Sequence, residues 1–234
     1  MKSAQIASVF GNTVTEIFHY PPKTERHMAV LILKGLYGEH VPHNAEHSWN
    51  IELISLLQHD HHVFLINTGR RSGENRTERF AGKTYRDECA DIMNAYTFIN
   101  SKMLSGEYIW EAVAMSFGGT LLLGLPEIMN ARHTLVFIGS GCGKSATTTK
   151  PILSTLPETE ILLDTMSRFS GNFFFLHGEL DDVVPLSSQQ LIYDAATRTK
   201  QKEWKSYPNL DHELRNVKTG ILETPQLAAT YIKK

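Results

Sequence analysis

The stretch that most constrains the fold of this chain is residues 110–120, where an apolar run ends at Ser116 and two glycines follow. The segment 113–115 is typical of a strand buried on both faces, whereas the three leucines after the glycines indicate a packed helix. Ser116 is therefore predicted to lie at a strand-to-helix turn. Such a turn points its side chain out of the sheet and needs small neighbours, because strand and helix pass close together. Ala114 and Gly118 meet that need.

The pattern Ala114-x-Ser116-x-Gly118 resembles the Gly-x-Ser-x-Gly nucleophile elbow of the α/β-hydrolase family, with alanine in the first glycine position. The resemblance implies that Ser116 is a catalytic nucleophile. A small residue, a serine and a glycine at this spacing also occur in ordinary strand–helix turns, so the pentapeptide does not decide the matter by itself.

Length and composition are those of an ordinary globular protein. The chain has 234 residues, and α/β domains routinely exceed the ~150-residue average without dividing. No tract rich in proline, glycine or serine interrupts it, so we expect a single domain over residues 1–234. The formal net charge of −2 gives no reason to expect a polyanionic partner, which disfavours nucleic-acid binding.

The two cysteines and the absence of long apolar runs bear on the compartment. Cys89 and Cys142 are far apart in sequence, which favours two packed thiols over a disulfide framework and fits a reducing compartment. No run of about 18 apolar residues occurs, and residues 1–11 contain no sustained apolar segment, so neither a membrane span nor export is indicated. We expect a cytoplasmic protein.

Apolar runs alternate with helical patterns along the chain. This alternation predicts an open, mostly parallel sheet of about eight strands with helices on both faces, an architecture resembling a minimal α/β-hydrolase. The expected strands are residues 4–10, 14–20, 28–33, 63–66, 113–115, 134–138, 172–176 and 203–207. The expected helices are residues 49–58, 85–103, 158–169, 189–196 and 223–233, with a further helix after the elbow.

A second loop that resembles the family follows the strand at residues 28–33. Lys34-Gly35-Leu36-Tyr37-Gly38 is similar to the family's His-Gly-x-x-Gly loop, with lysine in the histidine position. The glycine lets the chain turn so that a backbone N–H faces the site, and a side-chain change at Lys34 leaves that function possible. The resemblance implies that the N–H groups of Leu36 and Phe117 form the oxyanion hole, and Tyr37 is expected to contact substrate. An ordinary glycine turn is the alternative.

Two later loops extend the resemblance. Residues 177–185 match the family's His-Gly-x-x-Asp-x-x-Val-Pro pattern in every named position, which implies that Asp181 is the acid of the triad, with Asp182 as a nearby competitor. His212 lies in a loop that resembles the family's last one, which carries the catalytic base. The order Ser116, Asp181, His212 is the order of the triad in this fold.

Two other kinds of site are disfavoured by spacing. Gly139 to Ser145 is one residue shorter than the phosphate loop Gly-x-x-x-x-Gly-Lys-Ser/Thr, and loop length sets which N–H groups surround a phosphate. Metal sites need convergent ligands at rigid spacing. The histidines that could suggest one are scattered through loops and a helix end, where we expect solvated surface; they are His40, His43, His47, His59, His61 and His62.

The resemblance implies a serine hydrolase that cleaves a carboxylic ester or thioester of a small-molecule acyl substrate through an acyl-enzyme, with no metal or other cofactor. An amide or peptide hydrolase of the same fold is one alternative. A noncatalytic protein that keeps the fold and binds a small molecule or a protein is another, because Lys34 and Ala114 depart from the family pattern.

Overall fold

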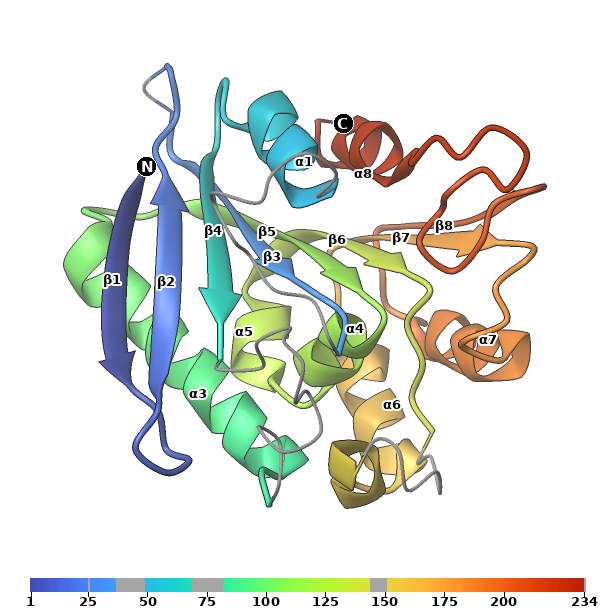
Figure 1. Cartoon of the computed structure of the whole chain (residues 1–234), viewed down its shortest axis with the longest axis horizontal. Helices are drawn as coiled ribbons and strands as arrows, with labels where there is room; N and C mark the ends of the chain where they lie inside the picture. Colours follow the sequence, from blue (N-terminus) through green and yellow to red (C-terminus); the bar gives the residue numbers. More distant parts are fainter. Residues whose placement is uncertain (25, 37–48, 69–81, 144–150, 234) are drawn as a thin grey trace.

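The computed structural model describes residues 1–24, 26–36, 49–68, 82–143 and 151–233 (Figure 1). Eight strands form one sheet in the order β1-β2-β4-β3-β5-β6-β7-β8. The strands are β1 (Lys2–Ala7), β2 (Val14–Tyr20), β3 (Met28–Leu33), β4 (His62–Asn67), β5 (Ile109–Met115), β6 (Arg132–Ile138), β7 (Asn172–Gly178) and β8 (Gln201–Tyr207). β2 is antiparallel to both β1 and β4, and every other neighbouring pair is parallel. The predicted mostly parallel sheet of about eight strands is confirmed.

Helices cover both faces of the sheet, as expected (Figure 1). One face carries the pair α1 (Trp49–Leu57) and α8 (Thr224–Ile232). The other carries α3 (Tyr85–Phe98), α4 (Phe117–Leu123), α5 (Pro126–Asn130), α6 (Thr159–Arg168) and α7 (Leu186–Ala195). A π-helical turn, Ile99–Met103, continues α3, and a 3₁₀ turn, Pro151–Thr155, precedes α6. Among the described residues, no helix combines the length and apolar character needed to cross a bilayer.

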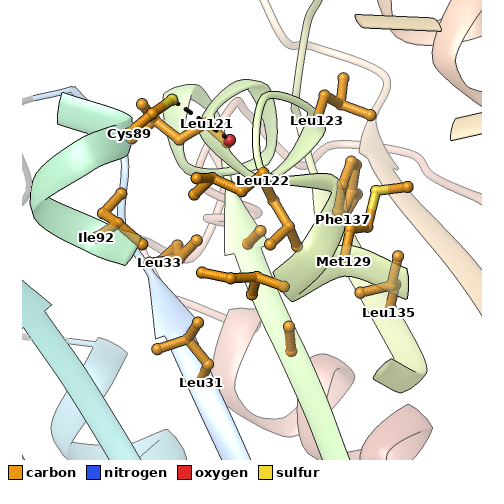
Figure 2. Close-up of a cluster of buried hydrophobic side chains, with 14 of the residues drawn as sticks. Leu31, Leu33, Cys89, Ile92, Leu121, Leu122, Leu123, Met129, Leu135 and Phe137 are labelled. Carbon is orange, nitrogen blue, oxygen red and sulfur yellow. Dashed lines mark hydrogen bonds between the residues drawn. The ribbon is translucent and has the colours of Figure 1, made fainter. Parts of the chain in front are cut away.

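The strand residues alternate between two cores, because successive side chains of a strand point to opposite faces. Leu31, Leu33 and Ala114 join the core beneath α3, α4 and α5, whereas Ile32 and Val113 join the core beneath α1 and α8. Figure 2 shows the first of these cores, where the leucines of α4 pack over the central strands. Burial on both faces explains why the central strands have almost no polar residues.

Several element ends differ from the sequence-based expectation. β1 ends at Ala7 instead of residue 10, because the N–H of Val9 turns to donate to Asp91 Oδ1 at 2.8 Å. α7 begins at Leu186 after Pro185, three residues earlier than expected. Ser188, in the first turn of α7, accepts with its Oγ from the N–H of Cys142 in the loop after β6, at 3.0 Å.

The expectation of a solvated histidine cluster was wrong for His61. Its side chain is 1% exposed, with Nδ1 2.6 Å from Asp60 Oδ1 and Nε2 3.1 Å from Glu111 Oε2. Burial by itself would lower the pKa of His61, but the hydrogen bonds and charges of Glu111 and Asp60 outweigh it and raise that pKa. The contact with Glu111 arises because β4 and β5 both begin at this edge of the sheet, and local sequence cannot reveal it. His59 is exposed, as expected.

Candidate active site

Ser116 occupies a backbone conformation that few residues other than glycine adopt. It lies between β5 and α4 with φ 52° and ψ −123°. Strain of this kind persists where the surrounding structure fixes the chain, and it is the backbone signature of a nucleophile elbow. α4 begins at Phe117, immediately after this residue, and not at the leucines as the sequence suggested.

The glycines after Ser116 allow α4 to pass close to its neighbours. A Cβ at Gly118 would clash with the carbonyl oxygen of Leu33 at the end of β3, and one at Gly119 would clash with the side chain of Ser140. Ser140 is fully buried in the loop after β6. A small residue is thus required at position 118, as predicted, because the backbone of Leu33 lies against it.

Asp181 and His212 form a hydrogen-bonded pair. His212 Nδ1 lies 2.9 Å from Asp181 Oδ2, and the two side chains are 12% and 0% exposed. The other carboxylate oxygen accepts the N–H groups of Val183 and Val184 at 2.9 and 3.0 Å. Burial tends to raise the pKa of Asp181, but the bonds from His212, Val184 and Val183 outweigh it and hold that pKa below its usual value. Asp182, the competitor, is exposed.

Ser116 and the Asp181–His212 pair flank one segment of backbone at the end of β6. The N–H of Ser116 donates to the carbonyl of Ile138 at 2.8 Å. The next residue, Gly139, has φ +51°, and a Cβ on it would lie 2.9 Å from His212 Nδ1 and 3.1 Å from Asp181 Oδ2. The backbone of Ile138 and Gly139 at the end of β6 therefore adjoins Ser116 on one side and the Asp181–His212 pair on the other.

The loop that carries His212 is built by hydrogen bonds within it and by close contact with β7. Asp211 Oδ1 accepts the N–H groups of Glu213 and Arg215, both at 2.9 Å, so the carboxylate fixes the turn around the imidazole. Gly178, at the end of β7, lies so close that a Cβ there would clash with the carbonyl oxygen of Asp211. The N–H of Leu180 donates to the carbonyl of Leu210 at 3.0 Å, which joins the two loops directly.

The loop after β3 lies beside Ser116. A Cβ on Gly35 would be 3.3 Å from Ser116 Cβ and 3.7 Å from Ser116 Oγ. Leu36 follows Gly35 and is 8% exposed, and the N–H of Phe117 belongs to the peptide that follows Ser116. Both backbone positions expected to form an oxyanion hole therefore belong to segments that adjoin the serine. Tyr37 lies outside the described residues.

The glycine-rich segment after β6 packs into the protein as part of this site. Gly141 is so close to α7 that a Cβ there would be 2.8 Å from Val184 and 3.0 Å from Ser188 Oγ. Thr120 Oγ1 donates to the Gly141 carbonyl at 2.6 Å. These contacts are those of a loop that packs against α4. They give no support to a nucleotide-binding site. The last two residues of the segment lie outside the described part.

Three residues that support the site were not singled out for this role by the sequence: Gly139, Gln189 and Asp211. Gly139 attracted notice only as part of the phosphate-loop comparison, and its real neighbours come from two other loops. Gln189 lies on α7, fully buried, with its amide nitrogen 2.9 Å from Asp181 Oδ2. The hydrophobic periodicity of a sequence does not reveal that a glutamine is buried. The Asp-x-Glu-x-Arg turn at Asp211 is the one local signal that could have been noticed.

Cys89 and Cys142 are free and buried, which confirms the expected packed thiols. In the described ranges, no group of three or more histidine, cysteine, aspartate or glutamate side chains could hold a metal ion.

Comparisons with known proteins place the fold. No protein-family model and no curated protein match the sequence. Among solved structures, the chain is similar to Est1E from Butyrivibrio proteoclasticus, with a TM-score of 0.66 and 10% identity over 98% of this chain and 99% of that one. A thermostable carboxyl esterase from Bacillus coagulans gives a TM-score of 0.71 and 12% identity, over 99% and 97% of the two chains.

A puromycin-hydrolyzing peptidase from Mycobacterium tuberculosis gives a TM-score of 0.72 and 14% identity, over 98% of this chain but 38% of that one. At such identities the likeness concerns the fold and not the activity. The likeness to Est1E and to the carboxyl esterase spans nearly the full length of the chains compared, and the sheet is mostly parallel with helices on both faces. The chain therefore has the α/β-hydrolase fold.

Proposed function

We propose that this protein is a serine hydrolase that cleaves a carboxylic ester or thioester of a small-molecule acyl substrate. The observation that carries the proposal is the contact of His212 Nδ1 with Asp181 Oδ2, 2.9 Å apart, beside the strained backbone of Ser116. The likeness of the fold to the carboxyl esterase from Bacillus coagulans supports the same reaction class.

In the proposed reaction, Ser116 Oγ attacks the acyl carbonyl carbon while His212 Nε2 takes its proton. Asp181 accepts the Nδ1–H of His212, which fixes the tautomer and stabilises the imidazolium. The backbone N–H groups of Leu36 and Phe117 donate to the oxyanion. His212 then returns the proton to the departing alcohol or thiol. Water, deprotonated by His212, releases the acid and restores the serine.

The first prediction concerns Ser116→Ala. Because the three side chains act as a unit, the variant should lose activity toward acyl esters and thioesters by about 10³-fold or more while its unfolding temperature stays close to that of the native protein. Ser187→Ala, at an exposed position on α7, is the matched control and should keep full activity. Turnover would be measured on p-nitrophenyl esters and acyl thioesters of graded chain length.

A fluorophosphonate probe gives an independent readout. Labelling that maps to Ser116 and disappears in Ser116→Ala supports an activated serine. Absence of both labelling and hydrolysis in the native chain would refute the proposal and favour a noncatalytic binding protein of this fold.

A second candidate is hydrolysis of an amide or peptide bond through the same residues. It is favoured by the likeness to the puromycin-hydrolyzing peptidase, which covers almost all of this chain. Aminoacyl-p-nitroanilides in the same panel distinguish the two: preference for them over the matched esters would replace the ester assignment.

A further inference from the structure

We infer that Gln189 is a positioning residue for the Asp181–His212 pair: its buried amide holds the carboxylate in place and limits how strongly it draws the proton of His212. This inference rests on the proposed function, because it assigns a role within the same site. No part of the sequence resemblance addresses this residue.

The contacts of Gln189 use both of its N–H donors and its carbonyl. Nε2 lies 2.9 Å from Asp181 Oδ2 and 2.8 Å from the carbonyl oxygen of Val184, and Oε1 lies 3.1 Å from His177 Nδ1. The side chain is fully buried. A carboxylate and a backbone carbonyl can only accept, so the nitrogen of the amide has to face them and the oxygen has to face His177.

That orientation of the amide determines which ring nitrogen of His177 carries a proton. Because Oε1 can only accept, His177 Nδ1 has to carry a proton and donate it. The imidazole of His177 is 6% exposed and lies against Trp204 of β8, with ring centroids 5.4 Å apart. The result is an unbroken chain of hydrogen bonds from His177 through Gln189 and Asp181 to His212.

Asp181 Oδ2 is shared between two donors, Gln189 and His212. Each hydrogen bond to a carboxylate stabilises its charge and lessens its hold on any other donor. With Oδ1 occupied by two backbone N–H groups, Gln189 is the one side chain other than His212 that bonds the carboxylate in the described structure. Gln189 therefore takes up part of the charge of Oδ2 that would otherwise act on His212 alone.

The test is Gln189→Met, which keeps the length of the side chain and removes its donors. Its matched control is Gln190→Met, because Gln190 is exposed on the same helix and donates to Asp194, on the surface of that helix, at 3.3 Å. The nearby groups that also titrate are His177, Asp182, Asp211 and Glu213, and both variants leave them in place.

The main readout is the pKa of His212, measured from imidazole ¹⁵N chemical shifts, which needs no enzyme activity. In Gln189→Met the carboxylate should hold the imidazolium more strongly, so the pKa of His212 should rise by about half a unit or more. The acid limb of kcat/KM should move up with it, and kcat/KM below that limb should fall about threefold, because a smaller fraction of His212 is neutral there. Gln190→Met should match the native protein in all three.

Gln189→Glu provides a second variant of nearly native shape, should the methionine variant fail to fold. A protonated glutamic acid can still donate to Asp181, whereas an ionised one repels it. Activity should therefore fall with rising pH in a range where the native profile is flat. An unchanged His212 titration in both variants, or a shift equal to that of Gln190→Met, would overturn the inference. Loss of the proposed function would appear separately, as absent Ser116-dependent hydrolysis in the native chain.

Discussion

At the scale of the residue, the site depends on positions where no side chain fits. Gly139 combines a positive φ with contact to the Asp181–His212 pair, so both its backbone freedom and its missing Cβ are used. Gly11, in the turn between β1 and β2, has a similar φ of +60° with nothing within 4 Å of a built Cβ. Substitutions at the two glycines therefore share the cost of a positive φ and differ in contact with the site.

Gly139→Ala is expected to lower both stability and activity. The positive φ should cost about 1–2 kcal/mol of the free energy of unfolding in Gly139→Ala and a similar amount in Gly11→Ala. Only Gly139→Ala should displace the imidazole of His212, which should lower kcat about 10²-fold. Urea unfolding and ester turnover of the two variants would test this. Equal kcat values for both would contradict the contact.

At the scale of the element, two histidines join β2 to β4. His19 Nε2 lies 2.8 Å from His62 Nδ1, and the His19 ring stacks on Phe64 with centroids 4.5 Å apart. Burial, together with the charges of His62 and Lys2, lowers the pKa of His19 from 6.5 to about 4. His19 therefore stays neutral in the folded protein at a pH where the unfolded chain would protonate it.

The sign of the pH dependence follows from this difference. Between pH 6.5 and about 4 the unfolded state binds more protons at His19 than the folded state, so stability is lost as the pH falls through this window. His19→Gln should flatten the decline of the unfolding temperature between pH 7 and pH 4. His59→Gln, at an exposed position, should leave the slope as it is. Parallel slopes for the two variants would count against the prediction.

At the scale of the whole molecule, a buried ion cluster ties three distant segments together. Lys83 Nζ lies 2.7 Å from Glu88 Oε2 and 2.8 Å from Asp91 Oδ2, both on α3, and donates to the carbonyl of Thr68 after β4 at 2.7 Å. Asp91 also accepts from Ser8 at the end of β1, at 2.6 Å. The cluster of Lys83, Glu88 and Asp91 thus bonds the segment after β4 through Lys83 and the segment after β1 through Asp91.

Lys83→Met is expected to destabilise the protein strongly. Glu88 and Asp91 have fully buried side chains, and removing their cation leaves two carboxylates in a poorly solvated place, at a cost of about 3–5 kcal/mol in the free energy of unfolding. Lys205→Met is the control, because Lys205 pairs with Glu203 on the surface, where solvent screens the pair and its contribution to stability is small. Chemical denaturation of both variants measures the difference, and similar losses would refute the prediction.

The sequence by itself determined the sheet, and it predicted the order of the candidate site residues along the chain. Buried strands such as Met28–Leu33 are continuous apolar runs, and a run of that kind can be recognised without knowing its neighbours. The small residues around Ser116 were likewise expected from local geometry, since a strand-to-helix turn needs them wherever it occurs. These features depend on residues adjacent in sequence.

Only the tertiary structure shows that Asp181, and not Asp182, is hydrogen-bonded to His212. The burial of His61 and the contacts of Gln189 were also beyond the sequence. Each depends on partners that lie on different elements and meet only when strands distant along the chain become neighbours. Periodicity records whether a side chain faces the interior, whereas hydrogen bonding in the interior depends on which other side chains arrive there.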